Sequence, residues 1–140
     1  MIVNREKVMA TGRILLVDDD LCFLYLLRFV LEADGIKTDK ATNGAEAVAA
    51  LDGMDFDLII TDFNLPVING VELAKIAKKR FPHIPIIMIT GEIGPDIVEM
   101  AGKAGISRIL YKPPNIEKLL ATIRHFSVGG VSYGKITACG

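Results

Sequence analysis

Four short apolar runs in this sequence are each followed by side chains that could take part in chemistry. The runs are Arg13 to Val17, Leu58 to Thr61, Ile86 to Ile89 and Ile109 to Tyr111, and the groups that follow them are Asp18 with Asp19, Asp62, Thr90 and Lys112. If the runs are parallel strands, these groups meet at one edge of the sheet, because ligand sites in an open α/β sheet lie outside the carboxyl ends of its strands. Carboxylates, a hydroxyl and an ammonium gathered there are suited to hold a cation beside a phosphoryl group.

The aspartates also predict the nature of the cation. Packed carboxylates repel one another, so Asp18, Asp19 and Asp62 would be unfavourable together without a hard divalent ion that prefers oxygen ligands. Plainer interpretations stay open, because acids can cap a helix or begin a loop, and the threonine and the lysine could be a turn cap and a surface residue. We assign the helix cap to Asp20 and the metal site to the other three aspartates.

The remaining sequence alternates between strand and helix patterns. Ile36 to Ala41 has polar residues at alternate positions, which predicts a strand at the sheet edge, whereas the unbroken run Ile86 to Ile89 is expected at the centre. Apolar spacing and caps predict helices over Asp19 to Asp34, Asn43 to Gly53, Val71 to Arg80, Gly94 to Gly105 and Asn115 to Phe126. Because parallel neighbours need a helical return, this alternation predicts a three-layer α/β/α sandwich around a five-stranded parallel sheet.

Composition limits the class of protein. A chain of 140 residues with 51% hydrophobic content is about one domain with one core. We predict that domain over residues 13–126, between an N-terminal tail, 1–12, and a flexible glycine-containing tail, 127–140. The net charge of −1, without a long basic run, argues against direct binding of nucleic acid.

Neither a membrane span nor a disulfide framework is expected. The longest apolar segment, Leu21 to Leu31, is interrupted by Arg28 and is shorter than the roughly 20 residues that cross a bilayer, and no secretory signal is visible before Gly12. Cys22 and Cys139 are too few and too far apart for a disulfide framework or a zinc site. We therefore expect a protein of the reducing cytoplasm.

Together, four motifs resemble the receiver domain of two-component response regulators. They are Ile14-Leu15-Leu16-Val17-Asp18-Asp19, Asp57-Leu58-Ile59-Ile60-Thr61-Asp62, Ile89-Thr90-Gly91 and Lys112-Pro113. Each is common alone, but all four in this order and at these spacings are specific, and the resemblance covers about residues 13–126. It implies the flavodoxin-like receiver fold with strand order 2-1-3-4-5 and makes Lys112-Pro113 a candidate for a cis peptide.

The resemblance implies a phosphoacceptor. Asp62 would be the nucleophile that takes a phosphoryl group from the phosphohistidine of a histidine kinase or histidine phosphotransfer protein, forming an acyl phosphate. Mg²⁺ would be held by Asp18, Asp19 and Asp62, together with the backbone carbonyl of Asn64. In this family Asn64 and Glu92 occupy positions that tune how quickly the acyl phosphate hydrolyses, although the sequence does not give the direction.

The switch implied by the resemblance depends on Lys112 and Thr90, each contacting a phosphoryl oxygen. Movement of Thr90 would shift the following loop and helix and so alter the output surface. Many receivers carry an aromatic residue three positions before the lysine, but here that residue is Ile109 and the aromatic Tyr111 adjoins Lys112. Pro114 stands where phenylalanine is common and stiffens the loop. We therefore expect transmission to rest on the threonine loop alone.

The first helix carries more apolar residues than one core needs. Its inward stripe is predicted to be Leu24, Leu27 and Leu31. A second stripe follows at helical spacing and consists of Cys22, Tyr25, Leu26 and Phe29. Either the helix is simply well buried, which we favour from the sequence, or the second stripe is a docking face for a phosphotransfer helical bundle.

The favoured function is a phosphorylation switch that signals to another protein and is not an enzyme beyond its own phosphorylation and dephosphorylation. A phosphorylation-independent pseudo-receiver is a second hypothesis. A third is an aspartyl-nucleophile phosphatase of the haloacid dehalogenase type, whose chemistry wants a second acid where this chain has Asn64. The cognate kinase, the downstream protein and any phosphorylation-dependent homodimer are left open.

Overall fold

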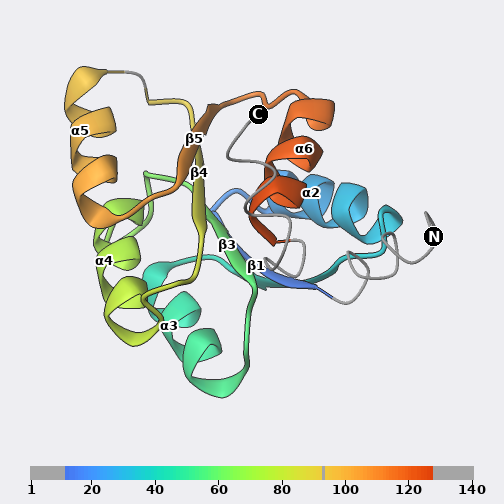
Figure 1. Ribbon diagram of the computed structural model, residues 1–140, viewed down its shortest axis with the longest axis horizontal. Coiled ribbons are helices and arrows are strands. Elements are labelled where there is room, and N and C mark those ends of the chain that lie inside the picture. Colours follow the sequence, from blue (N-terminus) through green and yellow to red (C-terminus); the bar gives the residue numbers. More distant parts are fainter. Residues whose placement is uncertain (1–11, 93, 128–140) are drawn as a thin grey trace.

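The computed structural model describes residues 12–92 and 94–127, where strands and helices alternate along the chain (Figure 1). The strands are β1 (Arg13–Val17), β2 (Lys37–Ala41), β3 (Leu58–Thr61), β4 (Ile86–Thr90) and β5 (Arg108–Tyr111). The helices are α2 (Leu21–Ala33), α3 (Gly44–Gly53), α4 (Gly70–Arg80), α5 (Pro95–Ala104) and α6 (Ile116–Ser127). All strand pairs are parallel and their order is β2-β1-β3-β4-β5, which confirms the predicted receiver topology.

Helices cover both faces of the sheet, α2 and α6 on one side and α3, α4 and α5 on the other (Figure 1). Alternate residues of β1 serve the two faces: Ile14 and Leu16 pack in the core with α2 and α6, and Leu15 and Val17 pack in the core with the other helices. All five residues of β4 are buried, as its unbroken apolar run predicts. Strand β4 lies inside the sheet, between β3 and β5, but the strand at the centre is β3. Strand β2 lies at the edge, also as predicted.

The ends of the elements differ from the predicted ends by one or two residues. Strand β4 includes Thr90, and α2 begins at Leu21, because Asp20 is its N-cap and accepts a hydrogen bond from the Phe23 amide at 3.2 Å. The cap assignment is thus confirmed. Asp18 and Asp19 lie outside the helix, in the loop that follows β1.

Helix α4 begins directly against the loop that follows β3. Asn69 and Glu72 form a capping box at its start, and the Gly70 amide donates to the Phe63 carbonyl at 2.8 Å. A Cβ atom at Gly70 would overlap the carbonyl oxygen of Asp62 and would lie 3.0 Å from its carbonyl carbon. Only glycine lets the helix approach the Asp62 backbone this closely.

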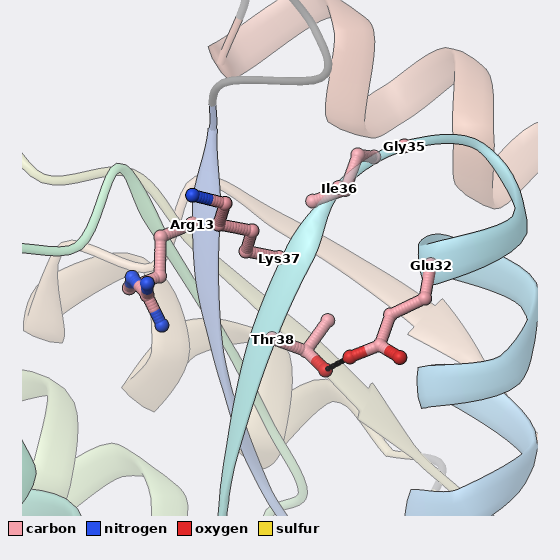
Figure 2. A pocket seen from close by; sticks show the side chains of 6 residues that line it. All are labelled: Arg13, Glu32, Gly35, Ile36, Lys37 and Thr38. Atoms are coloured by element: carbon pink, nitrogen blue, oxygen red, sulfur yellow. Dashed lines mark hydrogen bonds between the residues drawn. The ribbon is translucent and has the colours of Figure 1, made fainter.

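An open pocket of about 380 Å³ lies at the opposite, N-terminal end of β1 and β2 (Figure 2). Its lining includes Arg13 and Lys37, and Thr38 donates a hydrogen bond of 3.0 Å to Glu32. The Arg13 guanidinium is paired with Asp39 at 2.7 Å. This pocket is separated from the carboxyl ends of the strands by the length of the sheet.

Among the helices that the structure describes, none is long and apolar enough to cross a membrane. The two predicted tails, residues 1–12 and 127–140, lie outside the described residues except for Gly12 and Ser127.

Candidate functional site

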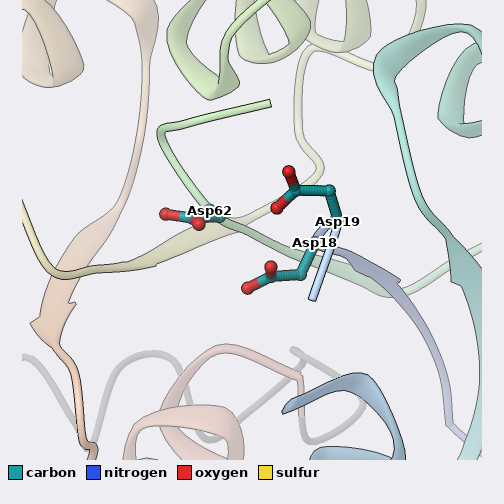
Figure 3. Close-up of side chains that lie close together, drawn as sticks. All are labelled: Asp18, Asp19 and Asp62. Atoms are coloured by element: carbon teal, nitrogen blue, oxygen red, sulfur yellow. The ribbon is translucent and has the colours of Figure 1, made fainter. Parts of the chain in front are cut away.

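The carboxyl ends of β1 and β3 bring Asp18 and Asp62 together. Val17 is the register partner of Thr61, so the next residue of each strand leaves the sheet beside the other (Figure 3). The Asp62 amide donates to the Val17 carbonyl at 3.0 Å, which fixes the spacing. Asp18 is 2% exposed and Asp62 is 7% exposed, whereas Asp19 lies at the exposed rim.

Lys112 reaches both buried carboxylates from the far end of the chain. Its Nζ atom lies 2.8 Å from Asp18 Oδ2 and 3.1 Å from Asp62 Oδ2. Burial lowers the pKa of Lys112, but the hydrogen bonds to the two carboxylates outweigh it, so the net direction is upward. Burial raises the pKa of Asp18, and the hydrogen bonds from Lys112 and from the Asp20 amide reduce this rise without cancelling it. The ammonium is therefore firmly charged and is shared between two acids.

The three predicted aspartates form one acidic cluster. A carboxylate oxygen from each of Asp18, Asp19 and Asp62 lies within 4.8 Å of the others. One ammonium leaves two of the three negative charges uncompensated when all three acids are ionised. An all-oxygen donor set with excess negative charge suits a hard divalent cation such as Mg²⁺, which binds through one or two carboxylates and keeps several waters. The residues present therefore fit the predicted ion.

Thr90 is fully buried at the end of β4, next to the strand that leads to Lys112. Its carbonyl accepts a hydrogen bond of 2.9 Å from the Lys112 amide. Its hydroxyl oxygen accepts one of 3.1 Å from the Glu92 amide, and the Glu92 carboxylate accepts one of 2.8 Å from the Asn64 side chain. The loops that follow β3 and β4 are thus joined beside the acidic cluster. The predicted role of the Asn64 carbonyl as a metal ligand stays a prediction.

Phe23 is a residue of the site that sequence reasoning missed. Its ring centroid lies 4.5 Å from Lys112 Nζ, and its side chain also packs against the core that α2 shares with α6. The available signal was its position in the first turn of the helix that follows Asp18 and Asp19. Helical spacing predicts on which face of the helix Phe23 lies, but it does not show that its ring contacts the ammonium of a lysine 89 positions later in the chain.

The second apolar stripe of α2 is exposed, so the favoured interpretation, that this helix is simply well buried, is wrong. Leu24, Leu27 and Leu31 are buried as predicted. The exposed residues, which we call the α2 surface, are Leu21 at 52%, Tyr25 at 55%, Leu26 at 49% and Phe29 at 75%, together with Cys22. Lys40 Nζ lies 4.4 Å from the centroid of the Tyr25 ring, but the ring stays more than half exposed.

Two residues of β5 depart from the usual pattern, and their effect on the switch stays a prediction. Ile109 is half-buried and Tyr111 is 43% exposed. The peptide between Lys112 and Pro113 is cis, which confirms that expectation.

Comparisons with known proteins agree with this geometry. The family model described as "Response regulator receiver domain" matches residues 14–124. The transcriptional regulatory protein TcrA of Mycobacterium tuberculosis is 34% identical over 120 residues, which are 84% of this chain and 47% of that protein. The chemotaxis protein CheY of Pseudomonas aeruginosa is 32% identical over 104 residues, which are 72% of this chain and 84% of that protein. The chain thus spans about half the length of TcrA but most of the length of CheY.

Solved structures show the same likeness. A CheY-like receiver domain protein from Methanospirillum hungatei is 33% identical with a TM-score of 0.78, covering 81% of this chain and 90% of that one. Chemotaxis protein CheY4 of Vibrio cholerae is 32% identical with a TM-score of 0.79, covering 82% and 98%. With the site residues gathered at the carboxyl ends of the sheet, these matches establish that the chain belongs to the response regulator receiver domain family of two-component systems.

Proposed function

We propose that Asp62 accepts a phosphoryl group from the phosphohistidine of a histidine kinase or histidine phosphotransfer protein, with Mg²⁺ bound by Asp18, Asp19, Asp62 and the Asn64 carbonyl. The observation that carries the proposal is the placement of Lys112 Nζ within 3.1 Å of both buried carboxylates inside the acidic cluster. A carboxylate that only began a loop would not be buried, joined to a lysine and set beside two further acids.

In this reaction an Asp62 carboxylate oxygen forms the new bond to phosphorus, and the bond from phosphorus to the donor nitrogen breaks with its electron pair left on the imidazole. Lys112 neutralises charge on a phosphoryl oxygen as it transfers. Bound Mg²⁺ supplies further neutralisation of the phosphoryl oxygens. The amide of Phe63 already donates to Asp62 Oδ1 at 2.6 Å, so the orientation of the acceptor carboxylate is fixed before a donor arrives.

The switch is proposed to run through Thr90. Its hydroxyl would turn to donate a hydrogen bond to the new phosphoryl group. The hydrogen bond that the hydroxyl oxygen now accepts from the Glu92 amide would thereby be disturbed. Because Glu92 also holds the Asn64 side chain, movement of this loop would loosen the link between the loops after β3 and β4 and reach α5. The surface around α5 is the proposed output to a downstream protein, and a phosphorylation-dependent homodimer would use such a surface too.

The α2 surface is the proposed docking face for the phosphohistidine protein. It lies on the helix that begins three residues after Asp18, and its apolar residues are exposed. Substituting Tyr25 and Leu26 together by glutamate should slow transfer from the protein donor and leave phosphorylation by acetyl phosphate unchanged. Equal loss with both donors would show that the stripe supports the fold instead.

The central test is phosphorylation by acetyl phosphate with Mg²⁺, which releases acetate, followed by intact-mass and peptide mass spectrometry. Labelling should be lost in Asp62→Asn and kept in the matched control Asp55→Asn, an exposed aspartate at the opposite end of β3. Labelling that survives Asp62→Asn would exclude the acceptor role. An unlabelled wild type would favour the pseudo-receiver, and repeated turnover of an external phosphoester would favour the phosphatase. We propose a signalling protein of the cytoplasm rather than an enzyme.

A further inference from the structure

Phe23 closes the third side of the Lys112 ammonium. An ammonium carries three N–H donors, and two of its neighbours here are the carboxylates of Asp18 and Asp62 at 2.8 and 3.1 Å. The ring of Phe23 lies 4.5 Å from Nζ at its centroid, within the range at which the negative face of an aromatic ring attracts a cation. The Lys112 side chain is 25% exposed, so acids and ring together leave a minor part of it to water.

The ring itself is held from two directions. The Phe23 amide donates to the N-cap carboxylate of Asp20 at 3.2 Å, which fixes the first turn of α2. The side chain packs against the core cluster that contains Leu24 and Leu27. Because the helix cap and the core hold the Phe23 ring in place, the ring can in turn restrain the Lys112 ammonium. The ammonium needs this restraint, since it is carried on a flexible four-carbon stem.

From this geometry we propose that Phe23 is a positioning residue for phosphoryl transfer: its ring face holds the Lys112 ammonium beside the Asp62 carboxylate, where a transferring phosphoryl oxygen arrives. The role rests on the proposed function of Asp62. A donor that is already in place when charge develops stabilises the transition state more than one that must first shed water and search its rotamers. The competing account is that Phe23 only fills the core next to α6.

The two accounts are separated by changing the charge distribution of the ring without changing its shape. We would place mono-, di- and trifluorinated phenylalanine at position 23 and compare them with Phe23→Tyr and Phe23→Leu. The rate of Asp62 phosphorylation by acetyl phosphate at saturating Mg²⁺ should fall stepwise along the fluorinated series. It should be near the wild-type rate in Phe23→Tyr and about fivefold lower in Phe23→Leu. Thermal unfolding checks that each variant is folded.

The chain offers a matched control in Phe126, whose ring lies 5.5 Å from the guanidinium of Arg108, a different cation from Lys112. The same fluorinated residues at position 126 should leave the phosphorylation rate of Asp62 unchanged. A second readout needs no phosphoryl donor: the Lys112 ε-methylene proton signals should be shifted upfield by the Phe23 ring and should move toward their ordinary position as fluorination proceeds.

An unchanged phosphorylation rate across the fluorinated series would overturn the positioning role, even if Phe23→Leu were slow, because packing alone would then explain the leucine variant. An equal response at positions 23 and 126 would overturn it as well. A wild-type protein that acetyl phosphate does not label at all would overturn the proposed function and this role with it. Failure of the proposed function is distinguished from failure of the positioning role because every protein would then be unlabelled, whatever the residue at position 23.

Discussion

Replacing Gly70 by alanine should damage both the stability and the chemistry of this domain. The added Cβ would overlap the carbonyl oxygen of Asp62, and it would lie 3.0 Å from the Asp62 carbonyl carbon and 3.2 Å from Phe63 Cα. All three neighbours are backbone atoms, which cannot rotate aside as a side chain can. Either the start of α4 or the backbone that carries the acceptor carboxylate must move.

The size of the effect follows from those contacts. Carbon atoms in ordinary contact are about 3.5 to 4.0 Å apart, so the backbone must shift by roughly 1 Å to accept the methyl group. Overpacking of this kind costs about 1–3 kcal/mol and occasionally more. The better helix propensity of alanine offsets up to about 1 kcal/mol of this cost, so the net loss of stability should be about 1–2 kcal/mol. A 1 Å displacement of a reacting group can also slow chemistry by about 100-fold.

The assay pairs urea unfolding with acetyl phosphate labelling of Asp62. Gly102→Ala is the matched control, because Gly102 is also helical and a Cβ there has no neighbour within 4 Å. It should gain about 0.5–1 kcal/mol of stability and be labelled at the wild-type rate. If Gly70→Ala behaved like Gly102→Ala in both measurements, the claim that α4 packs too closely on the Asp62 backbone to accept a side chain at position 70 would be refuted.

Three further outcomes are expected. Val67 is fully exposed with φ 72°, a conformation that asparagine tolerates better than a β-branched residue, so Val67→Asn should raise the free energy of unfolding by about 1 kcal/mol in urea titrations. Mg²⁺ at about 100 times its Kd should stabilise the wild type by about 2.7 kcal/mol, and Asp18→Asn should remove most of that gain in thermal unfolding. Burial raises the pKa of Asp18 above its usual 3.8, so the folded state holds this proton more tightly than the unfolded state. Without Mg²⁺, the wild type should therefore lose stability relative to Asp18→Asn as pH rises through that pKa, and a constant difference across an unfolding series from about pH 4 to 7 would contradict this sign.

The sequence sufficed for the sheet and for the residues at its edge, because both follow from repetition along the chain. Apolar residues fill β1 from Ile14 to Val17 and β3 from Leu58 to Ile60, and the parallel register of these two strands then places Asp18 beside Asp62. The ends of the elements were less certain, because one side chain decides them. At α2 the predicted first residue, Asp19, and the predicted cap, Asp20, did not agree; the structure has Asp20 as the cap, so the helix begins at Leu21.

The contacts that sequence reasoning missed are those that depend on what lies opposite a residue. The spacing of apolar residues on α2 revealed two stripes, but it could not show that one of them has no covering element. It likewise gave no sign that Gly70 touches the Asp62 backbone or that Val67 has a positive φ, since both depend on how one loop returns to the sheet. Asn64 and Glu92 were noticed separately, and only the fold shows the hydrogen bond between them.

Helix α2 joins three parts of the proposed mechanism on separate faces. Because Asp20 caps the helix, Asp18 and Asp19 stay in the loop before it. Phe23 in the first turn contacts Lys112, and the outward α2 surface is exposed and could be contacted by a partner. The inward leucines hold all of these to the same sheet that carries Asp62. A protein that binds the α2 surface would therefore contact the same helix that positions Lys112. The substitution Phe29→Glu should weaken this docking and leave the position of Lys112 unchanged. Since Phe29 is 75% exposed, its substitution should change the free energy of unfolding by less than about 0.5 kcal/mol.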